Sequence, residues 1–248
     1  MGTQNSNLIG KIILRWLLVV VVSCEYKDIG PRICYLASEQ TSSKVNFYTY
    51  DDDNELVSYL ATNVFSSIIT NDGAGKIISE LDNGNIHVDY TYDQSNRLVL
   101  WTETIDTNPS RNSQVKFMYN DVGQDTLKQV YKYDVSSSSY YLWFYTSLSY
   151  SSPGNKNYSQ RRTYDDLSTL IFTEKFLWDN HHNPYLTNPF FTNEPPPSNN
   201  VLQYELTFVG HIPSVVNYSY EYNSNGFPLS QTEIGNGPVA YYTYTNCN

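Results

Sequence analysis

The sequence has little charge and no long apolar run, and each of these two shortages excludes a class of protein. Asp, Glu, Lys and Arg make up 16% of the 248 residues, and the 25 acids outnumber the 15 bases. A surface that binds nucleic acid needs clustered Lys and Arg, so a chain with a net charge of −10 is not expected to bind it. The apolar run 16–22 is too short for a membrane-spanning helix, which needs about 20 residues.

Sequence motifs for catalysis and for metal binding are also missing. The patterns G-x-S-x-G and H-E-x-x-H and a Gly-rich phosphate loop do not occur. The adjacent His181 and His182 point in different directions on an extended chain, so we expect a solvated loop there. The acidic run 51–53 lacks the later ligands of a calcium loop. We therefore predict a protein that is not an enzyme and that needs no cofactor or metal.

The N-terminal segment 1–23 resembles a bacterial lipoprotein signal peptide. Two basic residues precede or adjoin the apolar run 16–22, and the small Ser23 precedes Cys24. A short apolar core of this kind is typical of a secretory signal. We predict cleavage before Cys24, lipid on that cysteine, and residues 24–32 as a tether. Several acyl chains hold a protein firmly at a membrane, so we expect a lipid-anchored protein of the cell envelope, at the outer membrane.

The other two cysteines lie near the two ends of the region 33–248, which we predict to be a single β domain. An even number of cysteines outside the reducing cytosol suggests a disulfide between Cys34 and Cys247, and two buried free thiols are the alternative. A disulfide requires a Cα separation of roughly 4.4–6.8 Å, whereas each strand of a flat sheet adds about 4.8 Å. The predicted disulfide therefore also predicts that the sheet curls until its ends meet.

An aromatic repeat with the period of a β-strand recurs along the chain, which has 24 Tyr. The copies are 47–56, 68–78, 88–98, 116–124 and 218–228. Alternation places Tyr90 and Tyr92 on one face, and the Asp93 carboxylate can accept N–H bonds in the turn that follows. The residues expected to take the positive φ of a tight turn are Asn54, Gly73, Gly75, Asn96 and Gly226. The predicted fold is all-β, an antiparallel meander of hairpin repeats that forms a strongly curved sheet or small barrel.

Three features together resemble a family of uncharacterised Bacteroidota lipoproteins with YD-like hairpin repeats and a porin-like fold. They are the lipidation signal, the segment 176–185 followed by 199–201, and the ending 242–247. The resemblance implies the same curved sheet or small barrel. It implies no activity, because the family has none to carry over.

The surplus of aromatic residues suggests a binding function. Exposed Trp101, Trp143 and Trp178 can stack on sugar faces, although alternating aromatic residues also build ordinary cross-strand pairs. The concave face of the sheet or the Pro-rich loop 180–200 is the expected site for a glycan or protein ligand. The alternative is a glycoside hydrolase-like enzyme in which two turn carboxylates face each other across a cleft.

We do not expect the sheet itself to cross a membrane. A membrane barrel carries an outward apolar band roughly 25 Å tall. The strand-like segments here alternate Tyr with Thr, Ser, Asp and Lys. Membrane attachment is therefore expected through the N-terminal lipid alone.

Overall fold

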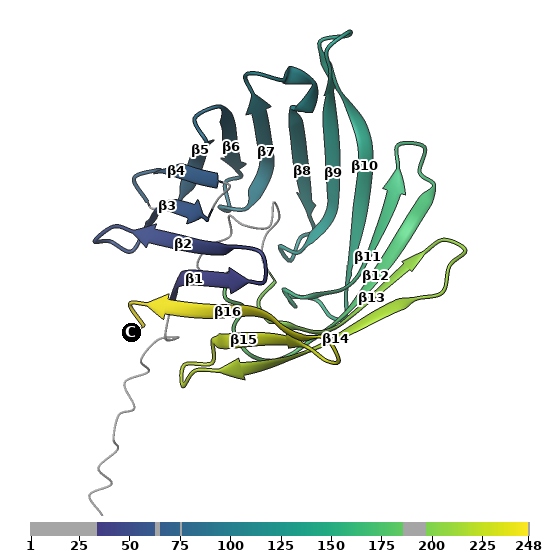
Figure 1. The fold of residues 1–248 in the computed structure, drawn as a ribbon. Helices are drawn as coiled ribbons and strands as arrows, with labels where there is room; N and C mark the ends of the chain where they lie inside the picture. Colours follow the sequence, from purple (N-terminus) through teal and green to yellow (C-terminus); the bar gives the residue numbers. More distant parts are fainter. Residues whose placement is uncertain (1–33, 63–64, 75, 186–196, 248) are drawn as a thin grey trace, which may run out of the picture. The chain divides into compact units, whose positions relative to one another are not determined.

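Sixteen antiparallel strands form a closed barrel in the computed structural model, which describes residues 34–62, 65–74, 76–185 and 197–247 (Figure 1). The strands are β1 (Tyr35–Thr41), β2 (Val45–Tyr50), β3 (Leu56–Ala61), β4 (Phe65–Asn71), β5 (Ile77–Asp82), β6 (Ile86–Tyr92), β7 (Leu98–Ile105), β8 (Ser113–Tyr119), β9 (Asp125–Asp134), β10 (Ser139–Tyr150), β11 (Tyr158–Asp165), β12 (Leu170–Trp178), β13 (Val201–Phe208), β14 (Ser214–Tyr222), β15 (Pro228–Glu233) and β16 (Gly237–Thr245). Each strand pairs with the next along the chain, as a meander requires. Within the described residues, one 3-10 turn, η1 (Pro109–Arg111), interrupts this pattern, and no helix has the length and apolar character to span a bilayer.

The barrel closes where the first strand meets the last (Figure 1). β1 and β16 pair antiparallel, with Glu39 opposite Tyr242. A disulfide joins Cys34 to Cys247 beside this seam, with a Cα separation of 4.2 Å and a sequence separation of 213. The structure thus confirms the predicted disulfide and, with it, closure of the sheet. The signal 1–23, Cys24 and the tether 24–32 lie outside the described residues.

Alternation along the strands separates the barrel interior from its outer face. In β8, Val115 and Phe117 are each 4% exposed, whereas Lys116 between them is exposed. The inward apolar residues gather into two clusters. One contains Leu36, Tyr48, Leu56, Ile69, Ile77, Ala240 and Tyr242. The other contains Val88, Trp101, Val115, Phe117 and Val130.

The repeated Asp or Asn closes its turn as the sequence predicts. The Asp93 carboxylate accepts hydrogen bonds from the backbone N–H of Ser95 (2.8 Å) and Arg97 (2.9 Å). Positive φ values occur at the expected Asn54 (63°), Asn96 (61°) and Gly226 (80°). A side-chain acceptor thus satisfies donors that the tight turn leaves unpaired. The prediction for Gly73 is wrong, because positive φ is absent there, and Gly75 lies outside the described residues.

A side chain at or near the end of most even-numbered strands, usually that of a tyrosine, makes a further bond to the backbone. The Tyr92 hydroxyl, near the end of β6, donates to the Ile77 carbonyl at the start of β5 (2.8 Å). The same bond from an inward side chain to the start of the preceding strand joins Tyr50 to Leu36, Asn71 to Leu56, Tyr119 to Leu98, Trp178 to Tyr158, Tyr220 to Val201, and Tyr244 to Pro228. The register of the β4–β5 ladder shifts between Thr70 and Asn71, and Asn71 lies opposite Ile77. The bond therefore satisfies a carbonyl where the regular ladder is interrupted.

The outer face of the barrel carries charge. On β6 the residues that alternate with buried Val88 are His87 and Asp89, and both are exposed. On the outer face of β12 and β13, Lys175 Nζ lies 2.7 Å from Glu205 Oε1, and the Lys175 side chain is 56% exposed. Such residues are costly on a lipid-facing surface. The outer face also carries exposed apolar side chains, such as Ile68 (65% exposed) and Leu177 (56%).

The bonds from tyrosine to carbonyl predict a measurable loss of stability. Tyr244→Phe removes one hydroxyl that donates to the Pro228 carbonyl at 2.7 Å. Because Pro228 is almost completely buried, we expect the free energy of unfolding to fall by about 1 kcal/mol in urea denaturation. Tyr241→Phe, on the outer face of the same strand, is the control and should change stability by less than about 0.5 kcal/mol. Equal effects of the two substitutions would contradict this role for the bond.

Candidate functional site

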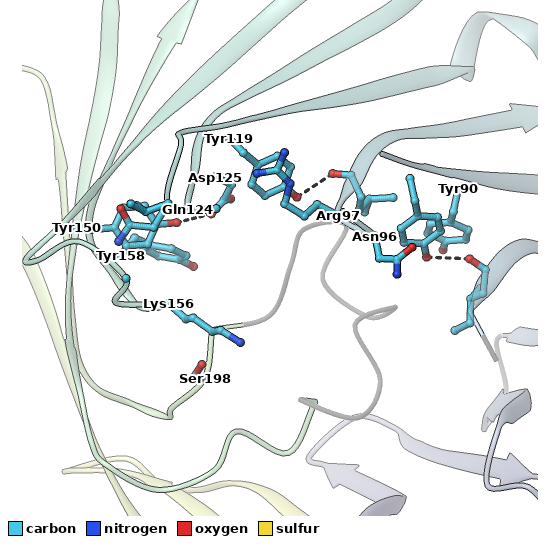
Figure 2. A pocket seen from close by; sticks show the side chains of 16 residues that line it. Tyr90, Asn96, Arg97, Tyr119, Gln124, Asp125, Tyr150, Lys156, Tyr158 and Ser198 are labelled. Carbon is cyan, nitrogen blue, oxygen red and sulfur yellow. Dashed lines mark hydrogen bonds between the residues drawn. The ribbon is translucent and has the colours of Figure 1, made fainter. Parts of the chain in front are cut away.

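A cavity of about 410 Å³ lies at the end of the barrel where the Asp and Asn turns gather (Figure 2). Five tyrosines from four strands line it: Tyr90 and Tyr92 on β6, Tyr119 on β8, Tyr150 on β10 and Tyr158 on β11. These strands are distant in sequence, and the curvature of the sheet brings their inward aromatic residues together. We call this space the tyrosine cavity.

The tyrosine rings of the cavity are held in place through their hydroxyl groups. Tyr92 and Tyr119 donate to backbone carbonyls at 2.8 Å, Tyr90 donates to Glu80 at 3.2 Å, and Tyr150 donates to Asp125. Burial raises the pKa of Tyr92 to about 12, so its phenol keeps its proton at neutral pH. The aromatic rings are therefore already ordered, and a ligand that binds to them does not bear the entropy cost of fixing them.

Three cations lie in or beside the wall of the tyrosine cavity, which also contains the carboxylate of Asp125. The Arg97 guanidinium carbon lies 4.6 Å from the centre of the Tyr119 ring, and Lys76 Nζ lies 4.7 Å from the centre of the Tyr92 ring. Lys156, on the turn before β11, also lines the space (Figure 2). Aromatic faces and cations thus alternate around one opening.

A second cavity of about 390 Å³ lies against β11 to β16. Arg161 donates to both carboxylate oxygens of Glu174, at 2.9 and 2.8 Å, and the Tyr204 hydroxyl donates to the same group at 3.0 Å. These bonds satisfy the charges of the two side chains within the wall. These polar side chains therefore have fewer hydrogen-bonding atoms left for a ligand in the second cavity.

The described parts of the predicted loop 180–200 are attached to the barrel. The Tyr185 hydroxyl donates to Glu39 Oε1 of β1 at 2.8 Å, and the Ser198 N–H donates to Asn157 Oδ1 at 2.8 Å. His181 stacks on the Tyr222 ring with centroids 3.9 Å apart, which differs from the solvated loop expected from the sequence. Ring stacking replaces solvation because this stretch packs against the end of β14. No cluster of three potential metal ligands occurs in the described part of the chain.

The three tryptophans singled out in the sequence lie in different surroundings. Trp101 is 6% exposed inside an apolar cluster, and Trp178 stacks on Phe176 with its indole N–H donated to the Tyr158 carbonyl. Trp143 is 51% exposed and lies beside Lys132. The structure does not bring the three into one surface, and their role in ligand binding remains a prediction.

Two buried carboxyl groups lie next to each other on β5. Glu80 and Asp82 are each 6% exposed, and Ser67 donates to Asp82. Burial, together with the hydrogen bond and the charge of Asp82, raises the pKa of Glu80 to about 9. Glu80 therefore keeps its proton at neutral pH. The sequence analysis missed this pair.

Solved structures that share the architecture include two porin-like proteins. A porin-like protein from Bacteroides vulgatus ATCC 8482 superposes with a TM-score of 0.59 at 9% identity, over 86% of this chain and 99% of that chain. A porin-like protein from Bacteroides uniformis ATCC 8492 gives a TM-score of 0.54 at 11% identity, over 87% and 98%. The fold is a porin-like β-barrel. No protein-family model and no curated protein matches the sequence, and at these identities the likeness concerns the fold alone.

The proton held by Glu80 makes the stability of the porin-like barrel depend on pH. Glu80 has an ordinary pKa of 4.5, and its pKa rises to about 9 in the folded chain. Between these values the folded state binds more protons than the unfolded state, so stability falls as pH rises from about 5 to 9. Each pH unit costs at most about 1.4 kcal/mol from this group.

Glu80→Gln should flatten this dependence and stabilise the barrel at pH 8–9 relative to the wild type. The amide keeps the shape of the side chain and needs no titrating proton. Urea denaturation at a series of pH values measures the slope, and Asp89→Asn on the exposed face of β6 is the control. An unchanged slope in Glu80→Gln would show that the carboxyl pair does not hold the proton.

Proposed function

We propose that this protein binds a glycan in the tyrosine cavity and acts without catalysis as a lipid-anchored component of the cell envelope. The observation that carries the proposal is the cavity itself, with rings already fixed by Tyr92 and Tyr119. A volume of about 410 Å³ falls within the range of small-molecule sites. A site that is mostly aromatic with a few polar groups suits a molecule with both apolar faces and polar edges.

Sugar rings have this amphipathic character. Their C–H faces can pack on the negative face of an aromatic ring, and their hydroxyls can bond to side chains at the edge. Asn96, Arg97 and Lys156 stand at such an edge in Figure 2. The arrangement favours a glycan over a protein ligand, because a recessed cavity admits one or two sugar units more readily than a folded surface.

The geometry gives less support to the hydrolase alternative. Carboxylates such as Asp93 accept hydrogen bonds within their own turns, which is a structural role. The carboxyl with a raised pKa, Glu80, bonds to its neighbour Asp82 rather than facing it across a gap. A glycosidase pair needs a separation of roughly 5 Å or more to hold the sugar between the groups.

Attachment to the envelope is inferred from the sequence features around Cys24. The charged outer face of the barrel supports a lipid anchor rather than insertion of the barrel into the bilayer, since Asp89 and Lys116 would both face lipid. The porin-like neighbours from two Bacteroides species, together with the turn geometry of the repeats, support membership of the Bacteroidota lipoprotein family named above.

Blocking the tyrosine cavity should abolish glycan binding. Val122 lines the cavity and is 56% exposed, and Val135, at the far end of β9, is also 56% exposed. On an array of neutral and acidic glycans, the purified full chain should bind a defined set. Val122→Trp should lose that set, because the indole occupies the opening, while Val135→Trp should keep it. The proposal fails if the wild type binds nothing, or if both variants bind alike.

The anchor has its own test. Metabolic labelling with an alkyne fatty acid should tag the wild-type chain and not Cys24→Ala. The variant should also leave the membrane fraction, because a protein without acyl chains loses its hydrophobic attachment. A wild type without label would refute lipidation and leave the binding proposal untouched.

A further inference from the structure

We propose that the ligand of the tyrosine cavity carries a carboxylate, so that the preferred glycan is acidic, with uronate-type sugars. This inference rests on the proposed glycan-binding function and adds the chemical class of the ligand. It follows from an inventory of the polar atoms around the cavity. The side chains of Asn96, Arg97 and Lys156 have hydrogen-bond donors that no described residue accepts from.

Asn96 offers a donor because its carbonyl is already used. Lys76 Nζ donates to Asn96 Oδ1 at 2.7 Å, which leaves the amide N–H₂ group for other partners. The same lysine lies 3.9 Å from the Asp72 carboxylate. The positive φ of Asn96 (61°) holds this side chain at the tip of its turn, beside the opening.

Arg97 offers a donor on one side of its guanidinium. Its Nε donates to Asp93 Oδ2 at 2.7 Å, and Nη2 lies 2.6 Å from the same oxygen. These bonds fix the plane of the group over Tyr119 and leave Nη1 without a partner in the described part of the chain. A carboxylate is the acceptor that best matches a guanidinium edge.

Lys156 is the cation whose charge is least compensated. It is exposed, lines the cavity, and forms no ion pair or hydrogen bond with any residue that the structure describes. Figure 2 shows Lys156 on one side of the cavity, with Asn96 and Arg97 on the other. Arg97 is partly neutralised by Asp93 in its own turn, so Lys156 supplies most of the local positive charge.

Other polar side chains of the cavity wall are already engaged. They include one carboxylate, Asp125, which accepts from the Tyr150 hydroxyl. Gln124 Nε2 donates to the carbonyls of Ser152 (2.9 Å) and Asn155 (2.8 Å), and its Oε1 accepts from Asn120. The phenol protons are also donated to the protein, as described above for Tyr92 and Tyr119. An anionic acceptor therefore finds three donors around one opening, whereas the net charge of −10 would repel it elsewhere on the chain.

The test compares acidic oligosaccharides with their own neutral esters. The probes are fragments of oligogalacturonate, alginate and hyaluronan, each also in a methyl-esterified form that keeps the sugar skeleton and masks the carboxylate. Calorimetric titration of the full chain should show at least one acidic fragment bound tenfold or more tighter than its ester. The preference should weaken with added salt, because the attraction is electrostatic.

Lys156→Gln should lower affinity for the acidic fragment about tenfold and leave affinity for the ester unchanged. Lys44→Gln, at the turn between β1 and β2 at the other end of the barrel, removes the same charge and should change neither. Equal binding of acid and ester, or equal effects of the two substitutions, overturns the acidic ligand while glycan binding stands. Absence of binding to every glycan, acidic or neutral, overturns the proposed function itself.

Discussion

The hydrogen bond from an inward side chain to the start of the preceding strand is the interaction on which this barrel depends. It recurs at the end of most even-numbered strands, from Tyr50 on β2 to Tyr244 on β16. Each such bond occupies a carbonyl near an irregularity in the ladder, where an unpaired carbonyl would be costly. The same bond fixes the ring that donates it. The bonds that satisfy these backbone carbonyls therefore also order the aromatic rings that line the barrel.

The interior of the barrel is polar as well as aromatic, and this sets a second constraint. Glu39 accepts from Asn46, Tyr48 and Tyr185, and Glu80 is hydrogen-bonded to Asp82. Buried acids are tolerated only when neighbouring donors satisfy them. Tyrosine suits this interior, because it combines a large apolar ring with one donor at its tip. A barrel lined by leucine would have no group to pair with these acids.

Much of the fold was predictable from local patterns, because the Asp and Asn turns and the alternation are local. Asp93 and Asn96 have the roles that turn chemistry assigns them. Among the residues, only the pair Cys34 and Cys247 predicted closure, because a disulfide requires two residues that are distant in sequence to lie close together.

The buried acids and the cavity were not predictable in the same way. A register shift between Thr70 and Asn71, beside the start of β5, disrupts simple alternation. Ile77 is therefore buried and Ile78 is 39% exposed, while Glu80 and Asp82 face inward. Trp101 illustrates the same difficulty, because residue type alone does not reveal which face of a strand a ring occupies. The cavity combines residues from β6, β8, β10 and β11, and their meeting depends on the curvature of the whole sheet.

The two kinds of residue at the cavity are under different constraints. Replacing Tyr92 or Tyr119 would leave a backbone carbonyl without its hydrogen-bond partner. Substitution of these rings would therefore lower the stability of the barrel. In contrast, the side chain of Lys156 bonds to nothing in the described structure, and Asn96 and Arg97 are bound only through part of their polar atoms. Substitution of these turn residues leaves the backbone bonds of Asp93 in place. A barrel of this construction can therefore alter the charge it selects at the turns while keeping the aromatic surface against which a ligand packs.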